Sequence, residues 1–182
     1  RGVVRVKKCL IIVDYQNDFV SGALGFPEAA ALAPRLAEKI RTYKAQGDDV
    51  IFTFDTHGEN YSDTQEGRHL PVPHCIEGTQ GHALAGEIAA LCEETDRCFR
   101  KNTFGSDALY EYLKRTPYER IELAGVVSNI CVISNAILAK TAQPETPILV
   151  VAGCTASGSA ALHAAALDVM AGLQIEIIGR KQ

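Results

Sequence analysis

Continuous apolar runs alternate with segments of helical periodicity along most of the chain. KCLIIVD (8–14) and VIFTFD (50–55) are short apolar runs that each end in an aspartate. Such runs are typical of parallel strands buried on both faces of a sheet. Shorter runs predict four more strands, at 97–101, 120–124, 148–152 and 175–178. Apolar residues at helical spacing predict helices over 27–46, 82–94, 106–115, 129–141 and 156–171.

This alternation of strands and helices predicts an α/β fold. Six strands separated by helices favour a mostly parallel sheet with helices on both faces and right-handed crossovers. The 182 residues suffice for one well-buried domain. Since neither an internal repeat nor a low-complexity linker is visible, we expect residues 1–182 to form a single domain.

Composition narrows the class of protein. The formal charge is −4, and basic residues form no stripe, which argues against nucleic acid as a partner. The apolar runs are shorter than the roughly 18 residues of a membrane span, so no membrane association is expected. We interpret the basic stretch 1–8 as a short solvated tail. Six cysteines without CxxC spacing, and without a signal peptide, indicate reduced thiols and a cytoplasmic location.

Polar residues at strand ends are the first candidates for function. In open α/β sheets, ligands bind outside the carboxyl ends of the strands. Asp14, Asp55 and Lys101 end predicted strands, and the turn after Ala124 leads to Cys131. We therefore expect these side chains to share one edge of the sheet.

Cys131 is the candidate nucleophile. It falls in the first turn of the predicted helix, where free backbone N–H groups favour a thiolate and can stabilise an oxyanion. Ser128 and Asn129 are suitable N-cap residues for that helix. The alternative is a buried structural cysteine, which is the usual role of an isolated cysteine.

A cysteine nucleophile needs a base and a charge partner. Lys101 can hold a thiolate by its charge, and Asp14 can move the proton to the leaving group and later activate water. Taken alone, Asp14 is better explained as a turn or cap residue at the end of a strand, and Lys101 as a solvated side chain. Only their convergence on Cys131 argues for catalysis.

A second set of residues has the chemistry of a metal site. Asp55 and His57 lie two positions apart, so in an extended segment both can reach one ion. The aperiodic segment 56–81 adds Glu66 and His74, whereas His69 is left out of the predicted site. The alternative is a set of loop residues that bind no ion.

Five segments together resemble the isochorismatase-like cysteine hydrolases, and within them the nicotinamidases. These segments follow one another in the family's order across nearly the whole chain. They are LIIVDYQNDFV (10–20), FTFDTH (52–57), LPVPHCIEGTQG (70–81), FRKNTF (99–104) and GVVSNICV (125–132).

The resemblance implies a Rossmann-like three-layer α/β/α fold and an Asp14–Lys101–Cys131 catalytic triad. It also implies a cis peptide between Val126 and Val127, which directs the Val127 N–H, with that of Cys131, into an oxyanion hole. The resemblance also implies a substrate pocket and a metal site. In the family, a divalent ion such as zinc at that site binds the pyridine nitrogen of the substrate. The implied residues are Phe19, Gln16, Phe104 and Val126 for substrate, and Asp55, His57, His74 and, least securely, Glu66 for metal.

The resemblance makes a small amide the expected substrate and a dimer or tetramer the expected assembly. The chain departs from the family in having Ser128 and Asn129 where Thr and Asp are common. It also has no Trp to stack on a substrate ring, a position that Phe104 or Tyr61 could fill. The alternatives are a metal-free amidase acting on a carbamoyl or ureido compound, an isochorismatase-type hydrolase and a non-catalytic binding domain. The metal-ligand set favours the nicotinamidase-like hypothesis.

Overall fold

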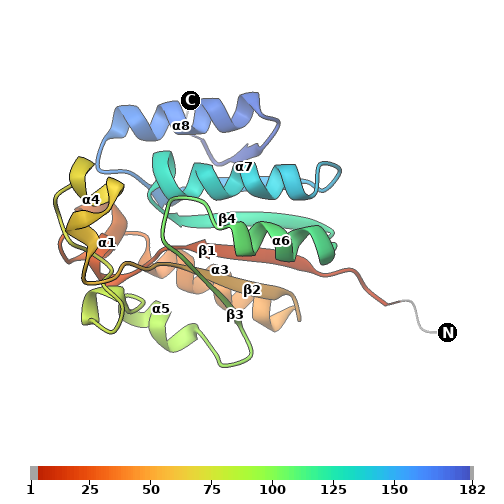
Figure 1. The fold of residues 1–182 in the computed structure, drawn as a ribbon. Coiled ribbons are helices and arrows are strands. Elements are labelled where there is room, and N and C mark those ends of the chain that lie inside the picture. Colours follow the sequence, from red (N-terminus) through yellow and green to blue (C-terminus); the bar gives the residue numbers. More distant parts are fainter. Residues whose placement is uncertain (1–3, 181–182) are drawn as a thin grey trace.

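The computed structural model describes residues 4–180, which are arranged around one six-stranded parallel sheet (Figure 1). The strand order across the sheet is β3-β2-β1-β4-β5-β6. Each neighbouring pair is parallel. The strands are β1 (Lys8–Val13), β2 (Asp49–Asp55), β3 (Arg97–Lys101), β4 (Arg120–Val126), β5 (Ile148–Ala156) and β6 (Glu176–Ile178).

Helices cover both faces of this sheet and complete the three-layer α/β/α architecture. On one face lie α2 (Pro27–Ala30), α3 (Ala33–Ala45) and α5 (Gly86–Leu91), and on the other α6 (Asp107–Arg115), α7 (Ile133–Ala142) and α8 (Ala160–Gly172). The short helices α1 (Asn17–Val20) and α4 (Gln65–His69) lie at the carboxyl ends of the strands. The predicted fold class is therefore confirmed, and the sheet is entirely parallel.

The central strand β1 shows why continuous apolar runs predicted this sheet. Leu10 and Ile12 pack into the core on the α3 side, whereas Ile11 and Val13 pack on the α7 side, and all four side chains are fully buried. Successive strand residues point to opposite faces, so a strand covered on both faces must be apolar throughout.

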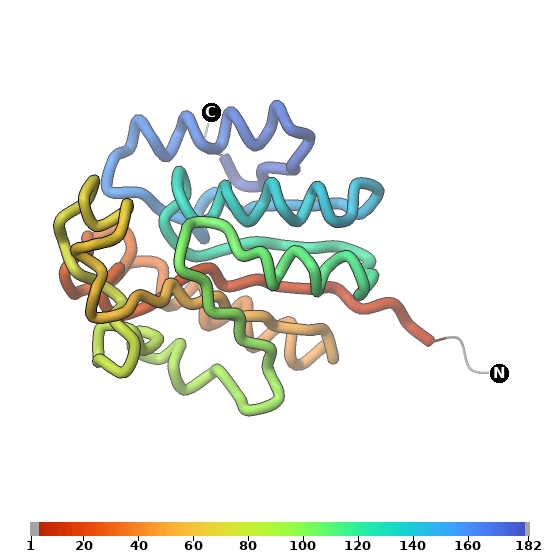
Figure 2. The backbone as a smooth tube through the Cα atoms, in the orientation of Figure 1, coloured from red at the N-terminus to blue at the C-terminus, as the bar shows by residue number. Residues whose placement is uncertain are grey.

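The strand order places a topological switch point between β1 and β4. From β1 the chain proceeds outwards to β2 and β3, and then returns to β4 on the other side of β1. The loops that leave β1 and β4 therefore diverge and open a crevice at the carboxyl edge. Segment 56–81 contains α4 and the single turn η1 (Tyr61–Asp63), and it ends within the turn η2 (Gln80–His82). This segment folds over the carboxyl edge at the end of the molecule opposite the N-terminus (Figure 2).

Three predicted helix boundaries were wrong for identifiable reasons. The helix predicted over 27–46 is divided between α2 and α3, and Pro34 lies in the first turn of the second helix, where its missing N–H has no cost. The helix predicted from 156 begins at Ala160, because β5 continues to Ala156 and the Ser159 hydroxyl then caps the Leu162 N–H. The helix predicted over 82–94 is confined to Gly86–Leu91.

Within residues 4–180 no helix is long and apolar enough to cross a membrane.

Candidate active site

Asp14, Lys101 and Cys131 lie together at the carboxyl edge of the sheet. Lys101 Nζ is 2.6 Å from Asp14 Oδ2 and 3.5 Å from Cys131 Sγ. All three residues are at most 5% exposed. Asp14 lies more than 80 positions before both Lys101 and Cys131 in the sequence, yet the three side chains are neighbours in the structure. This convergence was predicted from the positions of the residues at strand ends.

Strand register produces this convergence. Asp14 directly follows β1, and Val13 of that strand pairs with Thr53 of β2 and with Gly125 of β4. The Thr53 hydroxyl donates to Asp14 Oδ1 at 2.7 Å and fixes the orientation of the carboxylate. Lys101 ends β3 and is held by a second bond, from Nζ to the Thr103 carbonyl at 3.0 Å.

Burial and charge set the protonation behaviour of the three groups. Burial raises the pKa of Asp14 above its ordinary value, although the Lys101 charge acts in the opposite direction. Burial, reinforced by the Asp14 charge, raises the pKa of Cys131 well above that of a free thiol. Burial alone would lower the pKa of Lys101, but the charges of Asp14, Cys131 and Asp55 and the hydrogen bond to Asp14 together outweigh burial and raise that pKa. The arrangement therefore places a thiol beside a carboxylate that can accept its proton, with a fixed positive charge between them.

The turn that carries Cys131 differs from the predicted N-cap arrangement. A π-helical turn, η3 (Ser128–Val132), precedes α7, and its cap position is Val127, without a side-chain capping bond. Ser128 and Asn129 are therefore not N-caps. The Ser128 hydroxyl instead lies 2.9 Å from His163 Nδ1 of α8. The peptide between Val126 and Val127 is cis, as the family resemblance implied.

Two residues that sequence reasoning missed support this turn. The Asn135 amide nitrogen donates to the Cys131 carbonyl at 2.8 Å and to the Phe104 carbonyl at 3.1 Å, and its oxygen accepts from the Ser106 N–H. An asparagine four residues after a candidate nucleophile, inside a predicted apolar helix, was the available signal. Gly125, at φ +109°, is the other, because a Cβ there would lie 2.2 Å from the Val13 carbonyl oxygen.

Four side chains beside this triad form a compact cluster of metal-ligand type: Asp55, His57, Glu66 and His74. Asp55 Oδ2 lies 3.0 Å from His57 Nε2 and 3.2 Å from His74 Nε2. Glu66 Oε1 lies 3.8 Å from the first of these nitrogens and 3.7 Å from the second. Ligand atoms about 2.0–2.1 Å from a tetrahedral zinc ion are separated by about 3.4 Å. Two nitrogens and two oxygens at these separations fit a divalent ion such as zinc.

The surroundings of this cluster favour a cation. Burial acts to raise the pKa of Asp55, but hydrogen bonds from His57 and His74 reverse this and lower it below the ordinary value. His74 Nδ1 is paired with the Val72 carbonyl at 2.8 Å, which directs Nε2 towards the cluster. Lys101 Nζ lies 3.7 Å from Asp55 Oδ1, so the cluster and the triad are adjacent.

One pocket of about 390 Å³ connects the triad with the cluster. Cys131 lines it together with Asp55, Glu66 and His74. Most of the remaining wall is apolar, from Phe19, Leu24, Phe26, Leu70, Phe104, Val127, Ile130 and Leu162. A largely apolar cavity with a few convergent polar groups is typical of small-molecule sites.

Two residues implied as substrate contacts are not part of the pocket wall. Gln16 is fully buried, and its amide donates to the Asp55 and His82 carbonyls while accepting from the Asp55 N–H. It therefore holds the end of β2 in place. Val126 is also fully buried, within the core on the α3 side. Tyr61 packs edge-on against His57 and His74, outside the pocket lining, whereas Phe104 lines the pocket.

Comparison with known proteins agrees with this fold. Residues 8–182 match the isochorismatase domain, and the chain belongs to that family. It is 29% identical to the nicotinamidase/pyrazinamidase of Mycobacterium tuberculosis, over 94% of this chain and 98% of that protein. The solved structure of a pyrazinamidase/nicotinamidase from Streptococcus mutans superposes with a TM-score of 0.84 at 29% identity, covering 94% of this chain and 100% of that chain. A zinc complex of the Pyrococcus horikoshii pyrazinamidase gives 0.82 at 26% identity, covering 94% and 98%.

Proposed function

We propose that this protein is a cysteine-dependent amidohydrolase that converts a small aromatic amide of the nicotinamide type to its acid and ammonia. The observation that carries this proposal is that Cys131 and the Asp55–Glu66–His74 group line the same apolar pocket. The names of the relatives, nicotinamidases and pyrazinamidases, support the same class of substrate.

In the proposed reaction, the Cys131 sulfur attacks the amide carbon while Asp14 accepts the thiol proton. The N–H groups of Val127 and Cys131 stabilise the tetrahedral oxyanion. Asp14 then gives its proton to the leaving nitrogen, ammonia departs and a thioester remains. Asp14 next takes a proton from water, and the resulting hydroxide attacks the thioester. The C–S bond then breaks to release the acid, and Asp14 returns its proton to the Cys131 thiolate.

Lys101 stays charged throughout this cycle. Its ammonium lies beside both Asp14 and the sulfur, so it stabilises the negative charge whether that charge rests on the carboxylate or on the thiolate. Its role is therefore electrostatic, and the proton is carried by Asp14.

Four residues would hold a divalent ion: Asp55, His57, Glu66 and His74. Their two imidazoles suit zinc among the common cations. When bound, the ion supplies a Lewis-acid site for a ring nitrogen of the substrate. Phe19 and Phe104 line the same pocket and offer aromatic surfaces to the ring. These features favour a heteroaromatic amide over the carbamoyl or ureido compounds of the metal-free alternative.

The test is ammonia release by the zinc-loaded protein from nicotinamide, pyrazinamide and a carbamoyl compound. We expect turnover of the two aromatic amides, its loss in Cys131→Ser, and no loss in Cys154→Ser, which alters another buried thiol. Turnover of the carbamoyl compound alone would overturn the aromatic-amide assignment. Unchanged turnover in Cys131→Ser would overturn the nucleophile.

We also propose that the chain forms a homo-oligomer. The helix α8 is apolar around most of its circumference, and Leu162 and Val169 on it are each 52% exposed. A helix that is apolar on all sides is normally covered. Light scattering coupled to gel filtration measures the mass directly, and a monomer at micromolar concentration would contradict this proposal.

A further inference from the structure

Two cysteine side chains lie in contact outside the active site. Cys92 directly follows α5, Cys98 is the second residue of β3, and their sulfur atoms are 3.7 Å apart. A disulfide has an S–S distance of about 2.05 Å, so the two sulfur atoms need to approach each other by only about 1.65 Å to form one. The other four cysteines, Cys9, Cys75, Cys131 and Cys154, are all buried.

The two thiols differ in exposure and acidity. Cys98 is exposed, whereas Cys92 is half-buried against the core on the α3 side. The hydrogen bond from Cys92 lowers the pKa of Cys98 to about 7. The same bond, together with burial, raises the pKa of Cys92. Cys98 is thus the more accessible and more ionised thiol, and Cys92 is positioned behind it.

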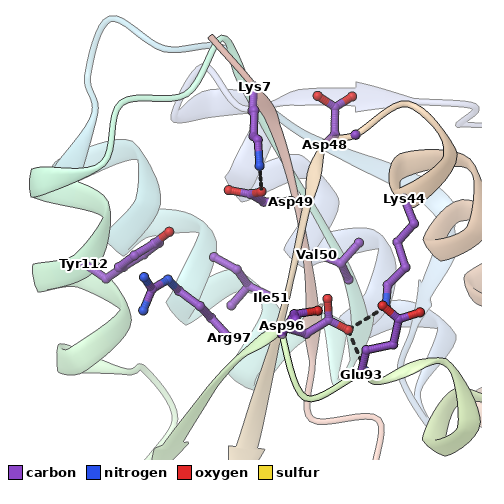
Figure 3. A pocket seen from close by; sticks show the side chains of 12 residues that line it. Lys7, Lys44, Asp48, Asp49, Val50, Ile51, Glu93, Asp96, Arg97 and Tyr112 are labelled. Atoms are coloured by element: carbon purple, nitrogen blue, oxygen red, sulfur yellow. Dashed lines mark hydrogen bonds and ion pairs between the residues drawn. The ribbon is translucent and has the colours of Figure 1, made fainter. Parts of the chain in front are cut away.

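Lys44 of α3 holds the turn between these cysteines, and Figure 3 shows its side chain beside Glu93 and Asp96 of that turn. Its ammonium donates to the Leu91 carbonyl at 2.8 Å and to Asp96 Oδ2 at 2.6 Å, and it lies 3.3 Å from Glu93 Oε2. Asp96 Oδ2 also accepts from the Glu93 N–H at 2.8 Å. One side chain therefore fixes both ends of the segment that separates Cys92 from Cys98.

We propose that Cys92 and Cys98 are a redox modification site, which forms a reversible intramolecular disulfide when a hydroperoxide oxidises the protein. The Cys98 thiolate attacks the peroxide, the O–O bond breaks, and a sulfenic acid and hydroxide form. The hydroxide takes the Cys92 proton, and the Cys92 sulfur displaces hydroxide from the sulfenic acid to form the S–S bond. The displaced hydroxide takes up the proton that Cys98 lost on ionisation, so in sum two thiols and one hydrogen peroxide give one disulfide and two waters. The bond joins the end of α5 to β3, the edge strand that ends in Lys101.

The experiment treats the reduced full chain with one equivalent of hydrogen peroxide, blocks the remaining thiols with an alkylating agent and digests with trypsin. Cleavage at Arg68, Arg97 and Arg100 separates the two cysteines. We expect a linked pair of peptides, 69–97 with 98–100, that dithiothreitol releases. Because peptide 69–97 also contains Cys75, the Cys92→Ser variant identifies the partner and is expected to abolish the linked pair. Cys154→Ser is the matched control and is expected to retain it.

Lys44→Met tests the positioning of the thiols. Loss of its three contacts is expected to slow disulfide formation several-fold while the alkylation rate of Cys98 by a small reagent stays within twofold. The proposal is overturned if oxidised wild-type protein yields no linked pair, if the pair persists in Cys92→Ser, or if Cys131 is oxidised before Cys98. An unchanged rate of disulfide formation in Lys44→Met would overturn the role of that residue.

Discussion

Lys101 and Asp14 form an ion pair with an Nζ–Oδ2 distance of 2.6 Å, and both side chains are almost completely withdrawn from water. A charge that is buried without its partner is costly, so each residue is needed to keep the other ionised. The same pair supports both the fold at this edge of the sheet and the proposed chemistry.

Replacing Lys101 by Met is expected to lower stability as well as activity. It leaves the Asp14 carboxylate buried without its cation, and breaking a buried pair costs about 3–5 kcal/mol. Urea unfolding followed by circular dichroism measures the difference. Lys114→Met is the control, since Lys114 pairs with Glu111 on the surface and is expected to change stability by less than about 1 kcal/mol. Equal effects of the two substitutions would contradict this account.

The pH profile of kcat/KM is expected to show an acid limb above the range of an ordinary aspartate. Asp14 must be ionised to accept the Cys131 proton, and burial raises its pKa above 3.8. A raised pKa means that the carboxylate becomes protonated, and activity declines, at a higher pH as the solution is acidified. The profile is measured at saturating zinc, with circular dichroism confirming the fold at each pH. Activity that is fully retained down to pH 4 would be inconsistent with Asp14 as the base.

The two histidines of segment 65–74 are expected to behave differently towards zinc. His74 belongs to the four-residue cluster, whereas His69 is exposed and pairs with the Gln65 carbonyl. His74→Ala is expected to weaken zinc binding at least tenfold, or by about 1.4 kcal/mol, and His69→Ala to leave it unchanged. Calorimetric titration of chelator-treated protein measures both. A similar loss in the two variants would argue against the assigned cluster.

Gln16→Leu is expected to act on stability and not on substrate contact. The substitution leaves the Asp55 N–H and the Asp55 and His82 carbonyls without their side-chain partner. Each buried polar group that loses its partner costs about 1–3 kcal/mol. Thermal unfolding is therefore expected to shift downwards while KM changes little at a temperature where the variant is folded. The reverse result, a raised KM with unchanged stability, would place Gln16 in contact with substrate.

The sequence predicted the sheet well because its strands are buried on both faces. A continuous apolar run such as LIIV in β1 is hard to explain except as a parallel strand buried on both faces. The carboxyl ends of such strands then indicate the edge of the sheet where the site lies. The residues at those ends, Asp14 and Lys101, could be found without knowledge of the strand order. The metal-ligand set could be found because its donors are concentrated between Asp55 and His74.

What the sequence did not reveal depends on local backbone geometry. The π-helical turn at Ser128–Val132 removed the expected N-caps, since the capping position falls on Val127. The family resemblance implied that Gln16 contacts substrate, but its side chain is directed to the backbone at the end of β2. Neither outcome follows from residue type or spacing, because both depend on where a neighbouring strand ends.

The pocket wall comes mostly from two separate stretches of chain, 19–74 and 127–162, and Phe104 lies between them in the sequence. Every residue of the candidate metal cluster comes from the first 74 positions, and the turn that carries Cys131 comes from beyond position 125. Changes in segment 56–81 can therefore alter which ring or heteroatom is accepted while the cysteine and its turn remain intact. Substrate preference and the proposed cysteine chemistry thus depend on different segments of this chain.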